Sequence, residues 1–221
     1  MTREELIKKV ALKMDEISSS DDVIVPVNAG DNNPLYTQIN NLLNESVNDV
    51  LMKAPIYRIQ SQIAMILPNN ITTEPIPAFN STRQVAVVQI PEEFIRLVSI
   101  TDNHFGRPIV TLDFEGSDVD KRQHNKFLVA KSSKPVAVIG RGTGLSGRAI
   151  KCYSYSEGAT VSPSVRYIKR YDNDRDTTSE TDLDEYMTDI VSWVCAGKVF
   201  AAQGDINKSK ICDENAASLM V

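Results

Sequence analysis

Apolar residues recur at helical spacing in the first quarter of the chain. Residues 2–17 begin with Thr2 and Glu5, a capping-box pair that favours a helix start. Residues 34–54 follow Asn33 and Pro34, a preferred N-cap and first-turn pair. The apolar faces of these two predicted helices consist of Leu6, Val10, Met14, Ile17, Ile39, Leu42, Leu43, Val47, Val50 and Leu51.

The helical period returns in the last fifty residues or so. Ser179 and Asp182 match a capping box and predict a helix that ends near residue 203, and Asp205 predicts the N-cap of a last helix carrying Cys212 and Ala216. The connection is so short that the two helices must pack antiparallel. Their wide apolar stripe comprises Leu183, Tyr186, Met187, Ile190, Val191, Val194, Cys195 and Val199.

Between these helical regions the period shortens to that of β-strands. Seven short runs are separated by turn residues and by no long helix, which predicts antiparallel pairing because parallel crossovers need about a dozen residues. Residues 59–68 fit either period, and Pro91–Phe94 predicts a short helical turn. The seven runs are VAVVQI, IRLVSIT, PIVTLDF, KFLVA, PVAVI, AIKCYSYS and SVRYIKRY.

These patterns together predict an α+β fold with three segments. Residues 1–55 supply N-terminal helices, residues 56–171 form an inserted and mainly antiparallel β domain, and residues 172–221 form a closing helical hairpin. Neither helical segment can bury its apolar stripe alone, so we expect helices from both chain ends to pack together.

Composition and charge narrow the function classes. The chain has 221 residues, of which 42% are hydrophobic and 24% charged, values typical of a globular protein. A net charge of −5 argues against nucleic-acid binding by the chain as a whole, although a local basic patch stays open. We expect no membrane span, a cytosol-like compartment, and reduced, buried thiols at Cys152, Cys195 and Cys212.

The stretch Gly140–Ala149, GRGTGLSGRA, follows a predicted strand and resembles a phosphate cradle. Such a loop needs a lysine for the β- and γ-phosphates, a hydroxyl for Mg²⁺ and a helix that starts beside it. Arg148 and Ala149 stand in the lysine and hydroxyl positions, and the following residues alternate like a strand. The sequence therefore favours a hairpin tip, with glycines that supply positive φ, over a nucleotide site.

Two further groups of residues invite a functional interpretation. Asp172, Asp174 and Asp176 resemble the start of a calcium loop, but the glycine and glutamate that such a loop needs are missing. His104 and His124 each lack a second metal ligand or a nearby nucleophile. We therefore expect no catalytic, cofactor or metal site.

Basic and aromatic residues provide candidates for contacts with an acidic neighbour or with DNA. Arg166 and Arg170 are spaced to share one face of a strand, with Tyr167 and Tyr171 interleaved, although a solvated strand face explains this pattern better than nucleic-acid contact. Trp193 lies beside the main apolar stripe and is either core or an interface anchor. The interface candidates are Tyr186, Trp193, Arg141, Arg148, Arg166 and Arg170.

Several segments, taken in order, carry a family pattern. VVQIPEEFIRLVSITDNHFGRPI combines a strand that ends in proline, a P-x-x-F turn and an apolar strand, and KPVAVI, AIKCYSYS and VRYIKRYD supply the next strands. NNPLYTQINNLLNESVNDVLMKAP matches a first long helix, and DLDEYMTDIVSWVCAGKVFAAQGDINKSKICDENAASL a closing hairpin with an acidic start and Gly-Asp at its turn. This order resembles the head-to-tail connector (adaptor ring) proteins of tailed bacteriophages, in particular the tail tubular protein A branch and the ring proteins of crAss-like phages.

The resemblance implies a structural virion protein and no enzyme. Connector proteins form a homo-oligomeric ring, typically a dodecamer, between the portal protein and the next tail or neck protein, and genomic DNA passes through it without sequence-specific binding. Twelve copies at −5 would carry about −60, and a negative wall lets DNA slide. The expected location is the neck of the virion, with assembly in the host cytoplasm. The alternatives are another virion component, for tail completion or capsid decoration, and a nucleotide-binding protein that uses the glycine loop.

Overall fold

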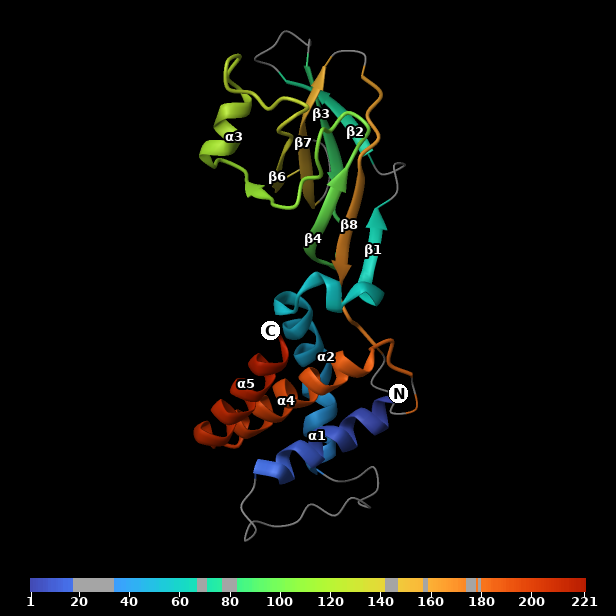
Figure 1. Cartoon of the computed structure of the whole chain (residues 1–221), viewed down its shortest axis with the longest axis vertical. Helices are drawn as coiled ribbons and strands as arrows, with labels where there is room; N and C mark the ends of the chain where they lie inside the picture. The colour runs from blue at the N-terminus through green and yellow to red at the C-terminus, as the bar shows by residue number, and fades with distance from the viewer. Residues whose placement is uncertain are drawn as a thin grey trace. The chain divides into compact units, whose positions relative to one another are not determined.

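The computed structural model in Figure 1 describes residues 1–17, 34–66, 71–76, 83–141, 147–156, 159–173, 178 and 180–221. Helices and antiparallel sheets form an α+β fold, as the sequence predicts. The chain divides into two compact units, a helical unit of Met1–Gln62 with Arg170–Val221 and a β unit of Ile63–Lys169. Residues 56–62, which the sequence analysis placed with the strands, form the short 3-10 helices η1 (Ile56–Arg58) and η2 (Gln60–Gln62) of the helical unit.

The helical unit is organised around one central helix. Its described α-helices are α1 (Arg3–Ile17), α2 (Pro34–Lys53), α4 (Glu185–Ala202) and α5 (Ile206–Leu219), and α4 packs against the other three (Figure 1). The predicted apolar stripes form the core of the helical unit. The side chains at the contacts of α4 with α1 and α2 are fully or almost fully buried. These include Leu6, Val10, Ile39, Leu43, Val47, Met187, Ile190, Val191, Cys195 and Val199.

The helix starts follow local capping rules with one exception. The Thr2 capping box is confirmed, since Glu5 N–H donates to Thr2 Oγ1 at 3.2 Å and Thr2 N–H donates to Glu5 Oε2 at 2.8 Å. Asp205 is also confirmed as the cap of α5. The predicted start near Ser179, which lies outside the described residues, is wrong: α4 begins only at Glu185, where the Asp184 carboxylate accepts the Met187 N–H at 2.8 Å.

The β unit contains two sheets in its described part. The first has the order β1 (Ile63–Ile66), β8 (Ser164–Lys169), β4 (Phe94–Thr101), with antiparallel pairs. The second has the order β2 (Ile71–Pro75), β3 (Arg83–Gln89), β7 (Arg148–Ser156), β6 (Val136–Arg141), β5 (Asp113–Phe114), and only its β5–β6 pair is parallel. Inward-facing residues of both sheets form a shared core that includes Ala86, Val88, Leu97, Ile100, Ile150, Tyr155, Val165 and Tyr167.

Several strand predictions fail where non-local pairing or a short helix decides the structure. PIVTLDF contributes only an Ile109 bridge to Ile100 and the two residues of β5. KFLVA is no strand but a turn that follows α3 (Asp118–Gln123), a helix that Ser117 caps. The expected helical turn at Pro91–Phe94 is a hydrogen-bonded turn, and β2 was not predicted at all.

Three asparagines one helical turn apart on α2, Asn40, Asn44 and Asn48, form what we term the asparagine ladder. Its first two members hold the fully buried Arg3 of α1. The Arg3 guanidinium donates to the main-chain carbonyl oxygen of Asn40 at 2.8 Å and to Asn44 Oδ1 at 2.7 Å. Hydrogen bonds to oxygen atoms compensate the cost of removing this cation from water.

Asn44 and Asn48 of the ladder bind the segment that follows β8. Asn48 Nδ2 donates to the Tyr171 carbonyl at 2.9 Å, and Tyr171 N–H donates to Asn48 Oδ1 at 2.8 Å. Asn44 Nδ2 donates to the Asn173 carbonyl at 3.0 Å. One face of α2 therefore binds both the N-terminal helix and the returning chain.

Asn48→Ala should lower the free energy of unfolding of the helical unit by about 1–3 kcal/mol, because it leaves both backbone groups of the buried Tyr171 without their partner. Urea unfolding followed by the fluorescence of Trp193, the only tryptophan, reports on this unit. Asn207→Ala, at an exposed position of α5, is the control and should change little. Equal losses in the two variants would contradict the role of the ladder.

Candidate interaction site

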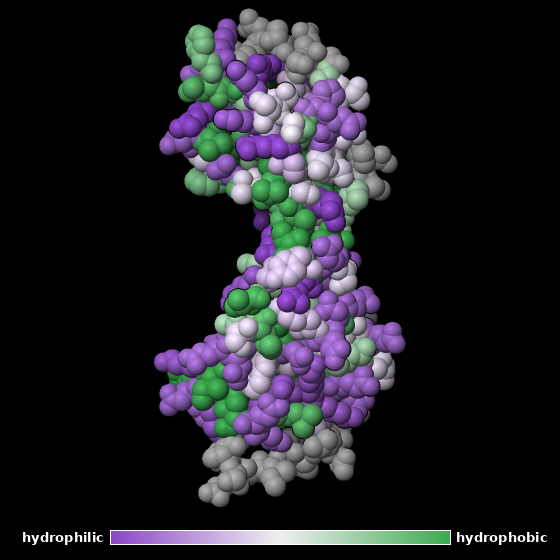
Figure 2. Space-filling model, in the orientation of Figure 1, coloured by the Kyte–Doolittle hydropathy of each residue, from purple (hydrophilic) through white to green (hydrophobic). Residues whose placement is uncertain are grey.

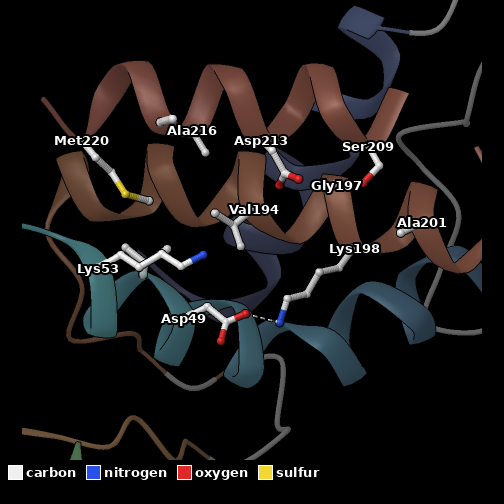
Figure 3. A pocket seen from close by; sticks show the side chains of 12 residues that line it. Asp49, Lys53, Val194, Gly197, Lys198, Ala201, Ser209, Asp213, Ala216 and Met220 are labelled. Atoms are coloured by element: carbon white, nitrogen blue, oxygen red, sulfur yellow. Dashed lines mark ion pairs between the residues drawn. The ribbon is translucent and has the colours of Figure 1, made fainter. Parts of the chain in front are cut away.

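The helical unit has a groove of about 490 Å³ between α2, α4 and α5 (Figure 3). We call it the α2–α5 groove. Most of the α4 and α5 side chains that line it are small, and α4 lies between α5 and α2 (Figure 3). Its lining residues are Asp49, Val50, Lys53, Val194, Gly197, Lys198, Ala201, Ser209, Asp213, Ala216, Ala217 and Met220.

Close packing and one ion-pair cluster shape this groove. A Cβ atom at Gly197 would lie 3.2 Å from the Cβ of Cys212, so glycine lets α5 approach α4. Lys198 Nζ lies 2.6 Å from Asp49 Oδ2 and 2.7 Å from Glu45 Oε1. Partial burial alone would lower the pKa of Lys198, but these hydrogen bonds outweigh it and raise the pKa. The Lys198 ammonium of α4 is therefore bound by the carboxylates of α2 and links the two helices.

Trp193 lies at a second hollow, between α1, α4 and α5. This Trp193 hollow has a volume of about 500 Å³, and Trp193 itself is half-buried. The rim residues Ile211 and Leu219 are 45% and 37% exposed. Its lining residues are Glu16, Ile17, Trp193, Ile211, Asn215, Ser218 and Leu219, so a single carboxylate is the charged group of the lining.

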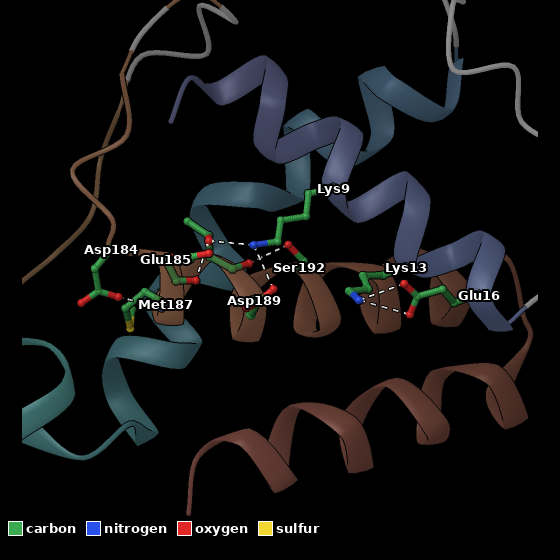
Figure 4. A network of polar contacts seen from close by, with 9 residues as sticks. Lys9, Lys13, Glu16, Asp184, Glu185, Met187, Asp189 and Ser192 are labelled. Carbon is green, nitrogen blue, oxygen red and sulfur yellow. Dashed lines mark hydrogen bonds and ion pairs between the residues drawn. The ribbon is translucent and has the colours of Figure 1, made fainter.

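Polar contacts hold α1 against α4 (Figure 4). Lys9 Nζ lies 2.9 Å from Asp189 Oδ1 and donates to Thr188 Oγ1 at 3.0 Å. One turn later, Lys13 Nζ lies 2.9 Å from Glu16 Oε1 and 4.8 Å from the centre of the Trp193 ring. The tryptophan is thus half-buried, and Lys13 covers one face of its ring.

Tyr186, another interface candidate, has an internal role. Its hydroxyl donates a hydrogen bond to the carbonyl of Leu219, and the Arg58 guanidinium lies 4.4 Å from the centre of its ring. These contacts join the start of α4 to the end of α5 and confirm that the two helices run antiparallel, as their short connection predicts.

The candidate arginines lie at separate places in the chain. Arg141 and Arg148 are exposed and face each other across the β6–β7 hairpin. Arg166 is exposed on β8, but β8 ends at Lys169 and Arg170 belongs to the helical unit, so the predicted shared strand face is wrong. Tyr167 and Tyr171, which interleave with them in the sequence, are buried.

The strand predicted after the glycine stretch is confirmed, since β7 begins at Arg148 where a phosphate loop would start a helix. Residues 142–146 lie outside the described residues. Gly147 has a positive φ of +116° as a hairpin glycine does, whereas Gly140 is required for another reason. A Cβ at Gly140 would lie 2.6 Å from the Glu115 carboxylate, which crosses the strand at that point.

Glu115 binds a lysine and a backbone N–H at the base of this hairpin. Its Oε1 lies 2.8 Å from Lys151 Nζ, and its Oε2 accepts the Arg141 N–H at 3.1 Å. These contacts, led by the hydrogen bond from Lys151, lower the pKa of Glu115, so the carboxylate is charged at neutral pH. The Lys151 ammonium is therefore engaged by Glu115 at the base of this hairpin.

Asp102 is the centre of a polar cluster in the β unit that sequence reasoning missed. Its side chain is 1% exposed, and it accepts the His104 N–H at 2.8 Å and the Tyr155 hydroxyl and Ser162 N–H at 3.0 Å each. The His104 ring nitrogen Nδ1 lies 3.0 Å from Oδ1. Burial would raise the pKa of Asp102, but the hydrogen bonds outweigh burial and lower it. The D-x-H spacing was the available local signal.

The remaining candidate chemistry finds little support in the described residues. They contain no group of three or more His, Cys, Asp or Glu side chains that could hold a metal ion, and Asp174 and Asp176 lie outside them. Cys152, Cys195 and Cys212 are buried free thiols, and burial raises their pKa values to about 12, 11 and 12. None of the described helices has the length and apolarity of a membrane span.

Neither the models of known protein families nor the curated proteins include a match to this chain.

Charge divides unequally between the two units. The helical unit contains 11 Lys and Arg against 20 Asp and Glu, a net charge of −9. The β unit contains 13 Lys and Arg against 9 Asp and Glu, a net charge of +4. The modest total of −5 therefore conceals an acidic and a basic unit.

Gly140→Ala should lower the stability of the β unit by about 1–3 kcal/mol, because the added methyl group collides with Glu115. Thermal unfolding followed by far-UV circular dichroism measures this loss. Adding Glu115→Ala removes two of the three close contacts, so the double variant should lose less than the sum of the single losses. Arg141→Ala in the same hairpin is the control, and strict additivity of the pair would refute the collision.

Asp102→Asn should lower the stability of the β unit at neutral pH by about 1–3 kcal/mol. Because folding lowers the pKa of Asp102, its ionised form stabilises the fold above the ordinary carboxyl pKa, and this contribution disappears as the pH falls through the folded-state pKa. The free energy of unfolding, measured with urea between about pH 7 and pH 3, should therefore depend less on pH in the variant than in the wild type. Asp118→Asn, whose side chain is 87% exposed, is the control; a variant with the wild-type pH profile would rule out this role of Asp102.

Proposed function

We propose that this chain is a structural virion protein that forms a ring in the neck of a tailed bacteriophage, between the portal protein and the next tail or neck protein. The order of its elements supports this proposal: a long helix α2, a block of strands and the closing hairpin α4–α5. This is the order that resembles the head-to-tail connector proteins. Genomic DNA would pass through the ring without sequence-specific binding.

The observation that carries the proposal is the exposed apolar surface of the helical unit. Large apolar side chains from η1 and each described α-helix except α4 are between 37% and 62% exposed, and green areas mark apolar residues on this unit in Figure 2. A contact between subunits would bury these side chains and gain hydrophobic free energy. The residues are Leu12, Met52, Tyr57, Ile206, Ile211 and Leu219.

The shape of this unit suits a contact between unlike surfaces. The α2–α5 groove and the Trp193 hollow share α4 and α5 but differ in the third helix, α2 or α1, and in charge. A repeated contact in which one face of a subunit meets another face of the next closes into a ring when the rotation allows it. At −5 for each copy, the ring keeps a net charge that disfavours tight binding of passing DNA.

The purified chain, mixed with the portal protein of the same phage, should form closed rings of one stoichiometry. Electron microscopy with light scattering would detect them. In assembled particles, cryo-electron microscopy with an antibody against the chain should locate it between portal and tail. A position on the capsid surface or at the tail tip would favour another virion component.

A chain that stays monomeric with portal and is missing from particles would overturn the proposal. Stabilisation by ATP or GTP in a thermal-shift assay, lost in Arg148→Ala, would instead favour a nucleotide-binding function.

A further inference from the structure

A turn in the β unit presents an unusually exposed aromatic side chain. Phe127 is 93% exposed and the adjacent Leu128 is 57% exposed. They follow α3 directly, and we call residues 125–128 the Phe127 tip. An adjacent apolar pair this exposed is a candidate for a contact with another protein.

Hydrogen bonds hold this tip in its outward position. Phe127 N–H donates to Asn125 Oδ1 at 2.9 Å, and Leu128 N–H donates to the Asn125 carbonyl at 3.1 Å. Gln123 is 2% exposed and accepts the Ala130 N–H at 2.9 Å. The chain is therefore anchored on both sides of Phe127, so the exposure of the ring is built into the turn.

The surroundings of the tip are basic. Lys121, Arg122 and Lys126 are exposed, and Lys121 pairs with Asp118 only at 3.8 Å. The whole β unit carries +4. A suitable acceptor therefore combines an apolar hollow with an acidic environment.

The Trp193 hollow has both properties. Ile17, Trp193, Ile211 and Leu219 provide apolar walls, and about 500 Å³ is enough space for a phenylalanine ring. Glu16 provides a carboxylate that pairs with Lys13 at 2.9 Å, so the acidic character comes mainly from the unit as a whole. The hollow belongs to the unit that carries −9. Contact between two Phe127 tips would bring basic units together, whereas contact between tip and hollow joins opposite charges.

We propose that the Phe127 tip of one copy docks into the Trp193 hollow of a second copy, with Phe127 beside Trp193 and Lys126 near Glu16. The contact joins unlike surfaces, so each copy can donate one tip and accept another. The inference rests on the proposed function in one respect only, that the repeated contact builds the ring of the phage neck.

A disulfide trap between two differently tagged full-length chains tests this contact. One chain carries Leu128→Cys and the other Ser218→Cys, which places the new thiols at the tip and in the hollow. The native thiols do not compete, because all three are buried. Val110→Cys replaces Leu128→Cys in the control chain, since Val110 is 61% exposed in the same unit.

The Leu128 pair should cross-link at least about tenfold faster than the Val110 pair, because docking raises the effective concentration of the thiols. Adding Phe127→Asp to the Leu128→Cys chain, or Trp193→Ala to its partner, should remove the advantage, and high salt should reduce it. Circular dichroism confirms that each variant folds, and Phe127→Asp alters a side chain with little packing to lose.

Equal rates for the Leu128 and Val110 pairs, or an advantage that survives Phe127→Asp, would overturn the contact. It would also be overturned if Phe127→Asp abolished binding to anionic lipid vesicles or duplex DNA and left cross-linking unchanged. The two proposals fail separately. If the chain lies in the particle neck but does not cross-link, the ring function stands and this contact is refuted. If it cross-links but is missing from the neck, the contact stands and the ring function is refuted.

Discussion

The amide of Asn48 binds both backbone groups of Tyr171, and the arrangement of the helical unit depends on this pair of hydrogen bonds. A chain that places more than a hundred residues between two helical segments must bring its second segment back to the first in a defined register. Asn48 sets that register, and Asn44 extends it to Asn173 while it also holds Arg3. Side-chain amides suit this role because each offers a donor and an acceptor to a strand-like backbone.

With the ends joined in this way, α4 can serve as the central helix. Its N-terminal half buries Met187, Ile190 and Val191, and its C-terminal half turns Gly197 toward α5. Lys198 adds the ion pairs that tie the helix to α2. The small residues bring α5 close and leave hollows on its flanks, so the packing that completes the unit also leaves surfaces that another protein can cover.

The parts of this structure that sequence predicts are those decided within a few residues. Helical periods and the caps at Thr2 and Asp205 are local, and both were identified correctly. The end of β8 was misjudged because it depends on Asn48, 123 positions from Tyr171. Asp102 was overlooked because its partner Tyr155 lies 53 positions away. The Phe127 tip was mistaken for a strand because a run of apolar residues in the sequence does not reveal which side chains are buried.

The contact between Gly140 and Glu115 links two positions that are remote in sequence. Residue 140 is confined to glycine only while residue 115 carries a side chain across the strand. If residue 115 became glycine in a related chain, residue 140 would be free to acquire a side chain of its own. The two positions are therefore expected to vary together during evolution, so that the glycine at position 140 records a packing constraint set by the turn that follows β5.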